Sequence, residues 1–426
     1  MRRFRLCVAL RNFIELGLVL AVQELHLHAA RALPGYPADS LNSFSAESEP
    51  FRRDDEEIEG RDFDYSDEDF LHRFTYRIRT DWQNVWNAEQ EGIVLTAGSA
   101  TTNELYAVHL LKKTIALNET FTGIIRHQRS EDFDGRYDRL LTGVGVNLPH
   151  NWSVSLVGDI VAEKEDIDPQ LELAWNSPWG HRLRVIYTAT DALFDEKNDE
   201  DAEYTRQPYT LFAEGRARLS EQLMLAGWMN YNSELELRMG DGRDFTYNQT
   251  MYQAAVLWQP NGNWQLLLSA GGQDGERALR SPESAVTSQL ERAHAGATFE
   301  VQFRHTDAFK TYYGYNYFYL SEIGLYPNVL PLGGELKRRE HMIYSGIIWQ
   351  ISDQIGISPG VYLDVIDNRY PADEEEIAER VEKLLAKITM PLEYSFSPRA
   401  KMTVNPTYEL HKTNFGGLNI QFLVLF

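Results

Sequence analysis

The sequence is poor in cysteine, in long apolar runs and in basic residues. Cys7 is the one cysteine in 426 residues, so the chain forms no internal disulfide, which suits an exported protein as well as many cytosolic ones. No uncharged apolar run reaches about 18 residues, which excludes membrane-spanning helices. Lys and Arg number 41 against 63 Asp and Glu, and the resulting net charge of −22 disfavours a nucleic-acid partner, because phosphate binding needs a basic surface.

The chain is rich in aromatic residues and in segments that alternate between apolar and polar positions. Trp152, Val154 and Leu156 alternate with Ser153 and Ser155, and the same pattern recurs along much of the sequence. An alternation with period two predicts β-strands with one apolar face. A soluble β-sandwich shows this pattern too, so the alternation alone leaves the architecture open.

The connections between these segments alternate in length. Short ones lie near 117–119, 149–151, 177–178, 220–221, 259–262, 352–353 and 397–398. Longer ones lie at 131–136, 163–168, 191–203, 240–244, 272–288, 324–337 and 367–379, and they are strongly acidic. Short turns at one rim and long loops at the other are typical of outer-membrane barrels, in which the short turns are periplasmic and the long loops extracellular.

We therefore predict an all-β fold, a transmembrane antiparallel up-and-down β-barrel of about 18 strands. The first strand is expected at Leu71–Trp82 and the second at Glu104–Ile115. Ile93–Ala97, within the first expected outer loop, is an alternative strand. In the loop at 367–379, Asp373 and Glu376 resemble a helical capping box, with Ile377, Val381 and Leu384 on one face, so a helix or a charged loop is expected there.

The N-terminal part of the chain has a different composition. Residues 1–32 have a basic start, an apolar stretch from Leu16 to Val22 and an Ala30-Arg31-Ala32 site, the pattern of a signal peptide. Residues 33–70 include twelve acids against three bases between Glu47 and Phe70, a composition typical of a solvated linker, which we expect to lie in the periplasm. The barrel is expected to occupy residues 71–426.

The last segment, Leu418–Phe426, alternates Ile420, Phe422, Val424 and Phe426 with polar residues, although Leu423 and Leu425 depart from strict alternation. It resembles the closing strand of Gram-negative outer-membrane β-barrels, the superclass that includes porins and export channels. The resemblance implies that Phe422 and Phe426 act as an assembly signal read by the barrel assembly machinery. It also implies a place in the outer membrane, with both termini periplasmic and with lipid and lipopolysaccharide as surroundings.

Aromatic residues near strand ends predict a girdle at the membrane boundary, and Trp258, Trp264 and Trp349 are examples. Tyr313, Tyr315, Tyr317 and Tyr319 share one face. They fit a lipid-facing position better than a sugar-stacking track in the lumen, because the latter would turn Asn316 toward lipid.

If the apolar face contacts lipid, the other face lines the lumen. The expected lumen-lining bases that form the candidate site are Arg73, Arg77, Arg79, Arg126, Arg182, Arg184, Arg216, Arg218 and Arg304, with Lys387 and Lys401 beside them. The expected lumen-lining acids are Asp81, Asp159, Glu172, Glu214, Glu300, Asp364, Glu393 and Glu409. Rings of Arg and Lys select anions in pores, but inward charges also pair simply with one another across strands, and both interpretations stay open.

The sequence favours transport over catalysis. No G-x-S-x-G or H-E-x-x-H motif occurs, and no catalytic residue, metal ligand or cofactor is expected. The first hypothesis is a channel for small polar solutes, including anions. The second is an exporter of an anionic polysaccharide, because an arginine-lined wall of this size resembles alginate-type export barrels. The third is a non-conducting structural or interaction barrel.

Overall fold

The computed structural model describes residues 91–99, 105–131, 136–159, 168–190, 192, 203–206, 208–240, 242–280, 288–325, 334–369, 380–411 and 413–426. The expected signal peptide, the acidic linker and the expected strand Leu71–Trp82, which carries Arg73, Arg77, Arg79 and Asp81, lie outside this range. Within it, one antiparallel sheet contains 21 strand segments, and one 3-10 turn, η1 (Pro149–Asn151), joins two of them. No helix in these ranges is long and apolar enough to cross a membrane.

The first half of the sheet runs from the closing seam to the first of the long strands. Its segments are β1 (Gly92–Ser99), β2 (Leu105–Ala116), β3 (Phe121–Glu131), β4 (Arg136–Leu148), β5 (Trp152–Asp159), β6 (Pro169–Asn176), β7 (Arg182–Ala189), β8 (Glu203–Arg206), β9 (Tyr209–Arg218) and β10 (Leu223–Arg238).

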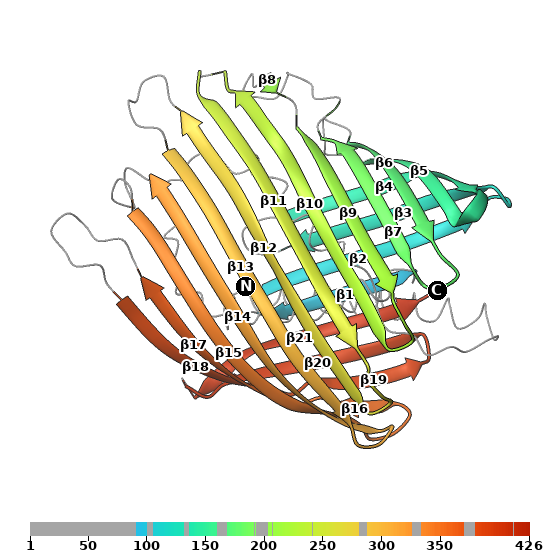
Figure 1. Cartoon of the computed structure of the whole chain (residues 1–426), viewed down its shortest axis with the longest axis vertical. Coiled ribbons are helices and arrows are strands. Elements are labelled where there is room, and N and C mark those ends of the chain that lie inside the picture. The colour runs from blue at the N-terminus through green and yellow to red at the C-terminus, as the bar shows by residue number, and fades with distance from the viewer. Residues whose placement is uncertain are drawn as a thin grey trace, which may run out of the picture.

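The second half contains longer strands and returns to the seam (Figure 1). Its segments are β11 (Asp244–Trp258), β12 (Trp264–Arg280), β13 (Ser288–Arg304), β14 (Phe309–Leu325), β15 (Gly334–Gln350), β16 (Ile355–Ile357), β17 (Gly360–Arg369), β18 (Arg380–Thr389), β19 (Leu392–Ser397), β20 (Ala400–Glu409) and β21 (Asn414–Leu425).

Three of the 21 segments are continuations of a neighbour along the chain, which leaves 21 − 3 = 18 strands in the wall. β8 and β9 both pair with β10, β16 and β17 both pair with β15, and β18 and β19 both pair with β20. A proline stands at each interruption: Pro208, Pro359 and Pro391. Proline has no N–H to donate to the ladder, so it interrupts the hydrogen bonding without ending the strand. The predicted count of about 18 is confirmed.

The wall closes between β1 and β21. β1 pairs with β2 on one edge and with β21 on the other, from Gly92 opposite Leu425 to Ser99 opposite Leu418. The seam strand is therefore Gly92–Ser99, which confirms the alternative strand at Ile93–Ala97. Placing the whole stretch between the first two expected strands, 86–103, in an outer loop was wrong, because residues 92–99 within it form a short strand.

The predicted short turns lie at one end of the wall, as expected, but the predicted long loops are confirmed only in part. The β10–β11 connection spans only 239–243, and residues 272–280 of the loop predicted at 272–288 belong to β12. Short turns join β2 to β3, β4 to β5, β6 to β7, β9 to β10, β11 to β12, β13 to β14, β15 to β16 and β19 to β20. We call this end the short-turn rim and the opposite end the long-loop rim. The backbone N–H of Phe426 donates to the carbonyl of Glu91 at the short-turn rim. The loop residues 370–379, and with them most of the expected helix, lie outside the described range, but Val381 and Leu384 belong to strand β18, so the helix prediction was wrong for them.

The two faces of the wall differ in chemistry. Large apolar side chains such as Leu171, Leu173 and Leu363 are exposed on the outer face, whereas polar side chains such as Glu172 and Asp364 are buried on the inner face. Tyr313 is 59% exposed and Asn316 is 1% exposed, so the tyrosine row of β14 faces outward as predicted. Leu423 and Leu425 depart from strict alternation because they pack inside the seam in a cluster with Val94 and Leu110.

On the inner wall, tyrosine rings lie against glycines of the neighbouring strand. Tyr344 is directly opposite Gly314, and a Cβ at Gly314 would overlap the Tyr344 ring. The Tyr344 hydroxyl donates a hydrogen bond of 2.8 Å to Glu300, and its ring stacks on Tyr362 with centroids 5.7 Å apart. Glycine is therefore required at position 314 by the close approach of a ring.

We expect Gly314→Ala to lower the free energy of unfolding by about 1–3 kcal/mol, because the added methyl group displaces Tyr344 from a packed position. Urea-induced unfolding in detergent micelles, followed by tryptophan fluorescence, measures the change. The matched control is Gly123→Ala, since a Cβ at Gly123 has no atom nearer than 3.9 Å, and its effect should stay within about 0.5 kcal/mol. Equal effects of the two substitutions would contradict the packing argument.

Candidate functional site

The candidate site is a sector of the inner wall that carries five of the arginines expected in the lumen. β3, β7 and β9 place these arginines on the inner face, and β6 and β9 each place one glutamate among them. This arginine sector consists of Arg126, Arg182, Arg184, Arg216 and Arg218, with Glu172 and Glu214 between them. Strand alternation determines their orientation, because residues directly opposite in an antiparallel ladder share a face. Their role in ion selection stays a prediction.

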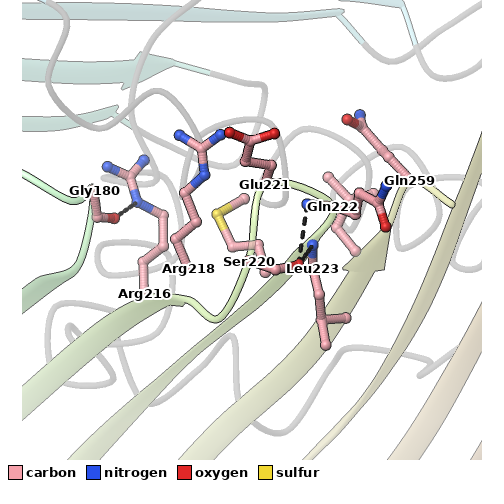
Figure 2. A pocket seen from close by; sticks show the side chains of 10 residues that line it. Gly180, Arg216, Arg218, Ser220, Glu221, Gln222, Leu223 and Gln259 are labelled. Atoms are coloured by element: carbon pink, nitrogen blue, oxygen red, sulfur yellow. Dashed lines mark hydrogen bonds between the residues drawn. The ribbon is translucent and has the colours of Figure 1, made fainter. Parts of the chain in front are cut away.

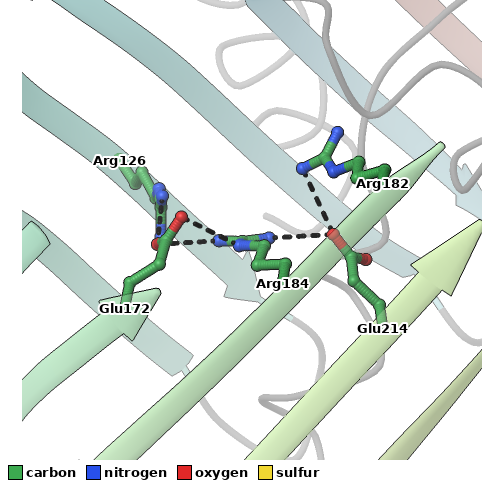
Figure 3. A network of polar contacts seen from close by, with 5 residues as sticks. All are labelled: Arg126, Glu172, Arg182, Arg184 and Glu214. Carbon is green, nitrogen blue, oxygen red and sulfur yellow. Dashed lines mark hydrogen bonds and ion pairs between the residues drawn. The ribbon is translucent and has the colours of Figure 1, made fainter. Parts of the chain in front are cut away.

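Glu172 and Glu214 connect three of these arginines into one network (Figure 3). Glu172 accepts from Arg126 at 2.7 Å and from the Nε of Arg184 at 3.0 Å. Glu214 lies 3.2 Å from Arg182 and 3.6 Å from Arg184, so Arg184 stands between the two carboxylates. All five side chains are at most 11% exposed. Charged groups with so little solvent contact depend on one another for compensation.

The sector holds more positive than negative charge. Five arginines stand against Glu172, Glu214 and Glu221, the last of which lines the same pocket as Arg216 and Arg218, so the excess is two positive charges. Arg182 stands directly opposite Arg216 across the β7–β9 ladder, although like charges in that position destabilise a sheet. Arg216 donates from Nε to the carbonyl of Gly180 at 3.1 Å, which positions its guanidinium near the short-turn rim.

A small pocket opens beside Arg216 and Arg218 at the short-turn rim (Figure 2). Its volume is about 220 Å³, and Arg216, Arg218 and Glu221 are the charged residues that line it. Met224 and Leu257 supply an apolar part. Gly180, with a φ of 82°, shapes the neighbouring turn, a backbone conformation that favours glycine. A cavity of this size, lined by two guanidinium groups and one carboxylate, has room for a small polar solute and not for a large ligand.

The remaining predicted bases lie apart from this sector. Lys401 is 2.7 Å from Glu393, and Lys387 is 3.8 Å from Glu409. Arg304 contacts the carbonyl of Gly262 and lies 3.5 Å from Asp307, so it connects two turns of the short-turn rim.

Arg338 and Glu340 form a buried inner ion pair that the sequence analysis missed. Charged residues occupy every position from Lys337 to Glu340, which obscured the alternation there. Tyr312, Tyr344 and Tyr362 also line this part of the inner wall, and the first two are almost fully buried. The lumen thus has a basic sector at β3–β9 and an aromatic, charge-paired sector at β14–β20. In the described ranges, no group of three or more His, Cys, Asp and Glu side chains is arranged to hold a metal ion.

Among known proteins, weak likenesses to solved structures are found. No family model matches the chain, and no curated protein matches it. OccK2 (OpdF) of Pseudomonas aeruginosa is similar with 14% identity and a TM-score of 0.39, over 79% of this chain and 98% of its own. The CymD monoaromatic hydrocarbon channel has 9% identity and a TM-score of 0.34, over 80% of this chain and 88% of its own. A bacterial polysaccharide outer membrane secretin has 9% identity and a TM-score of 0.36, over 79% of this chain and 98% of its own.

Likenesses of this size carry no argument about function. The assignment of the architecture rests on the wall itself, a closed ladder of 18 antiparallel strands with an apolar outer face and a polar inner face. The chain is a closed antiparallel β-barrel with the apolar outer face of a membrane-spanning wall. The residues of the inner wall are the features that bear on the function of the barrel.

We expect Glu172→Gln to destabilise the barrel by about 3 kcal/mol, because it leaves Arg126 and Arg184 without a shared carboxylate at a buried position. Chemical denaturation in detergent gives the value. The matched control is Glu234→Gln, which breaks the exposed ion pair with Arg206 and should cost less than about 1 kcal/mol. Similar losses for both would show that the buried network does not stabilise the wall.

Proposed function

We propose that the barrel is an outer-membrane channel that prefers small anionic solutes. The observation that carries this proposal is the arginine sector, where Arg182 faces Arg216 and the arginines outnumber the nearby glutamates. Simple cross-strand pairing would match each base with an acid, as Lys401 and Glu393 do on the opposite sector. An excess of guanidinium groups over carboxylates in a pore wall attracts and selects anions.

The position of the excess supports the same function. Arg216 and Arg218 stand at the short-turn rim, beside the small pocket, where a solute enters or leaves the lumen. The chain as a whole has a net charge of −22, so this sector opposes the overall charge. A local field of one sign within a narrow cleft raises the local concentration of the opposite ion. The role of the barrel is then transport, without a catalytic step.

The proposal includes an orientation in the outer membrane. Glu91 and Phe426 meet at the short-turn rim, and the sequence of the long loops is acidic. In bacterial barrels the short turns face the periplasm and the long loops the outside. We therefore place the short-turn rim, the pocket and the described ends of the wall on the periplasmic side.

The double variant Arg216→Glu/Arg218→Glu should shift the reversal potential in planar bilayers toward cation preference, with an anion-to-cation permeability ratio at least about fivefold lower. The reason is that four charge units change at the mouth of the lumen. The change should be smaller in high salt, because counterions screen partly exposed charges.

The control for this measurement is Arg206→Glu, an exposed residue that pairs with Glu234 on neighbouring strands. It should leave the reversal potential unchanged. If the pore variant has wild-type selectivity, the arginine sector does not select ions.

Liposomes that contain the wild-type barrel should swell in isotonic solutions of small sugars and faster in small organic anions of similar size. Swelling rates measured by light scattering test this. Liposomes that swell in neither solute would exclude the channel and leave a non-conducting barrel.

A further inference from the structure

The pocket at the short-turn rim contains charges of both signs. Arg216 and Arg218 at the end of β9 supply two guanidinium groups, and Glu221 in the turn between β9 and β10 supplies one carboxylate. Figure 2 shows all three charged ends projecting to the same side of the ribbon. Among the described residues, neither Arg218 nor Glu221 has an ion-pair partner, so both charges are available to a solute in the pocket.

The turn between β6 and β7 positions the two arginines. Arg216 donates from Nε to the carbonyl of Gly180 at 3.1 Å. The backbone N–H of Arg218 donates to Nδ1 of His181 at 3.1 Å. Two successive residues of one turn therefore hold the end of β9, and the guanidinium groups stand at a defined edge of the pocket.

Hydrogen bonds also fix the turn that carries Glu221. The Ser220 hydroxyl oxygen accepts from the backbone N–H groups of Gln222 and Leu223 at 3.1 and 3.0 Å. The backbone N–H of Gln259 donates to the carbonyl of Gln222 at 2.7 Å, which joins this turn to the end of β11. Serine side chains that accept from the backbone in this way stabilise tight turns. Glu221 therefore has a defined place opposite the arginines.

The inner part of the pocket is apolar. Met224 and Leu257 line it and are only 7% and 3% exposed. They pack in one cluster with Ala255 and Leu267, so neighbouring side chains hold them in place. Pockets of this kind, apolar with a few fixed polar groups, bind solutes whose carbon atoms meet the apolar surface and whose polar ends meet the charges.

The charge pattern discriminates among small solutes. A dicarboxylate without an amino group meets both guanidinium groups, but the carboxylate of Glu221 repels it. A neutral amino acid meets Glu221 and one guanidinium group and leaves the second without a counter-charge. A solute with two carboxylates and one ammonium group complements all three charges of the pocket. At neutral pH an acidic amino acid has this set of charges, because both carboxyl groups are ionised and the amino group is protonated.

We propose that this pocket binds acidic α-amino acids, with glutamate as the representative. The two carboxylates contact Arg216 and Arg218, and the ammonium group contacts Glu221. The methylene carbons lie against Met224 and Leu257. Charge-assisted hydrogen bonds of this kind are stronger than neutral ones.

The inference rests on the proposed channel and names the class of solute that it carries. An acidic amino acid has a net negative charge, which agrees with a preference for small anions. The volume of about 220 Å³ is below the roughly 300–1,000 Å³ of pockets for drug-sized ligands, which restricts the site to a small solute.

The test is isothermal titration calorimetry of the purified barrel in detergent with three probes of equal carbon number. These are L-glutamate, glutarate, which lacks the amino group, and norvaline, which lacks the second carboxylate. L-glutamate should bind at least about tenfold more tightly than either of the others, because each missing group removes a charge-assisted contact.

Glu221→Gln should remove the preference for L-glutamate over glutarate, since the ammonium group loses its carboxylate partner. Arg218→Gln should weaken the binding of both L-glutamate and glutarate at least about tenfold. The matched control is Glu119→Gln, an exposed acid in the short turn between β2 and β3 and outside the pocket. It should bind all three probes as the wild type does. Heat-modifiable migration on gels checks that each variant is folded.

Equal binding of L-glutamate and glutarate by the wild type, or an unchanged preference in Glu221→Gln, would overturn the proposed solute class. The bilayer measurement tests the channel separately. An anion-selective barrel that does not bind L-glutamate would retain the channel and exclude this site. Binding of L-glutamate by a barrel without anion selectivity would retain the site and exclude the anion channel.

Discussion

The structure depends on one constraint, that every backbone N–H and C=O group within a bilayer must find a partner in the protein. A sheet satisfies this only when it has no free edge. β1 provides the solution, since it pairs with β2 on one side and with β21 on the other. The interruptions at Pro208, Pro359 and Pro391 are tolerated because the segments on both sides of each proline keep a common neighbour.

Closure of the ladder determines where every side chain points. Alternate residues of each strand face lipid or lumen. The alternation of apolar and polar residues in the sequence therefore gives the wall two surfaces of different chemistry. The same rule that exposes Leu171 and Leu173 brings Glu172 between Arg126 and Arg184. The charges of the chain are therefore sorted by position, with a basic excess at β3–β9 and paired charges at Lys401–Glu393 and Arg338–Glu340.

Much of this arrangement could be predicted from the sequence, because the period of two survives in most strands. The number of strands, the two rims, the outward tyrosines of β14 and the inward position of Glu172 all follow from alternation and from the spacing of turns. The seam strand was harder to find, because Gly92–Ser99 is short and small residues end it. Arg338 and Glu340 were missed because charges occupy both faces at that end of β15. Contacts between strands distant in sequence, such as Arg126 with Glu172, need the register, which no local pattern contains.

The position of the seam affects how the chain folds. Thr96 and Gln421 are neighbours across it, at a sequence separation of 325. The first strand of the wall therefore waits for the last one to be synthesised before either has a full set of partners. A topology with contacts this distant folds slowly, and its exposed strand edges invite aggregation in the meantime. The cluster of Val94 and Leu110 with Leu423 and Leu425 therefore requires both ends of the wall, so that closure of the barrel involves the whole chain.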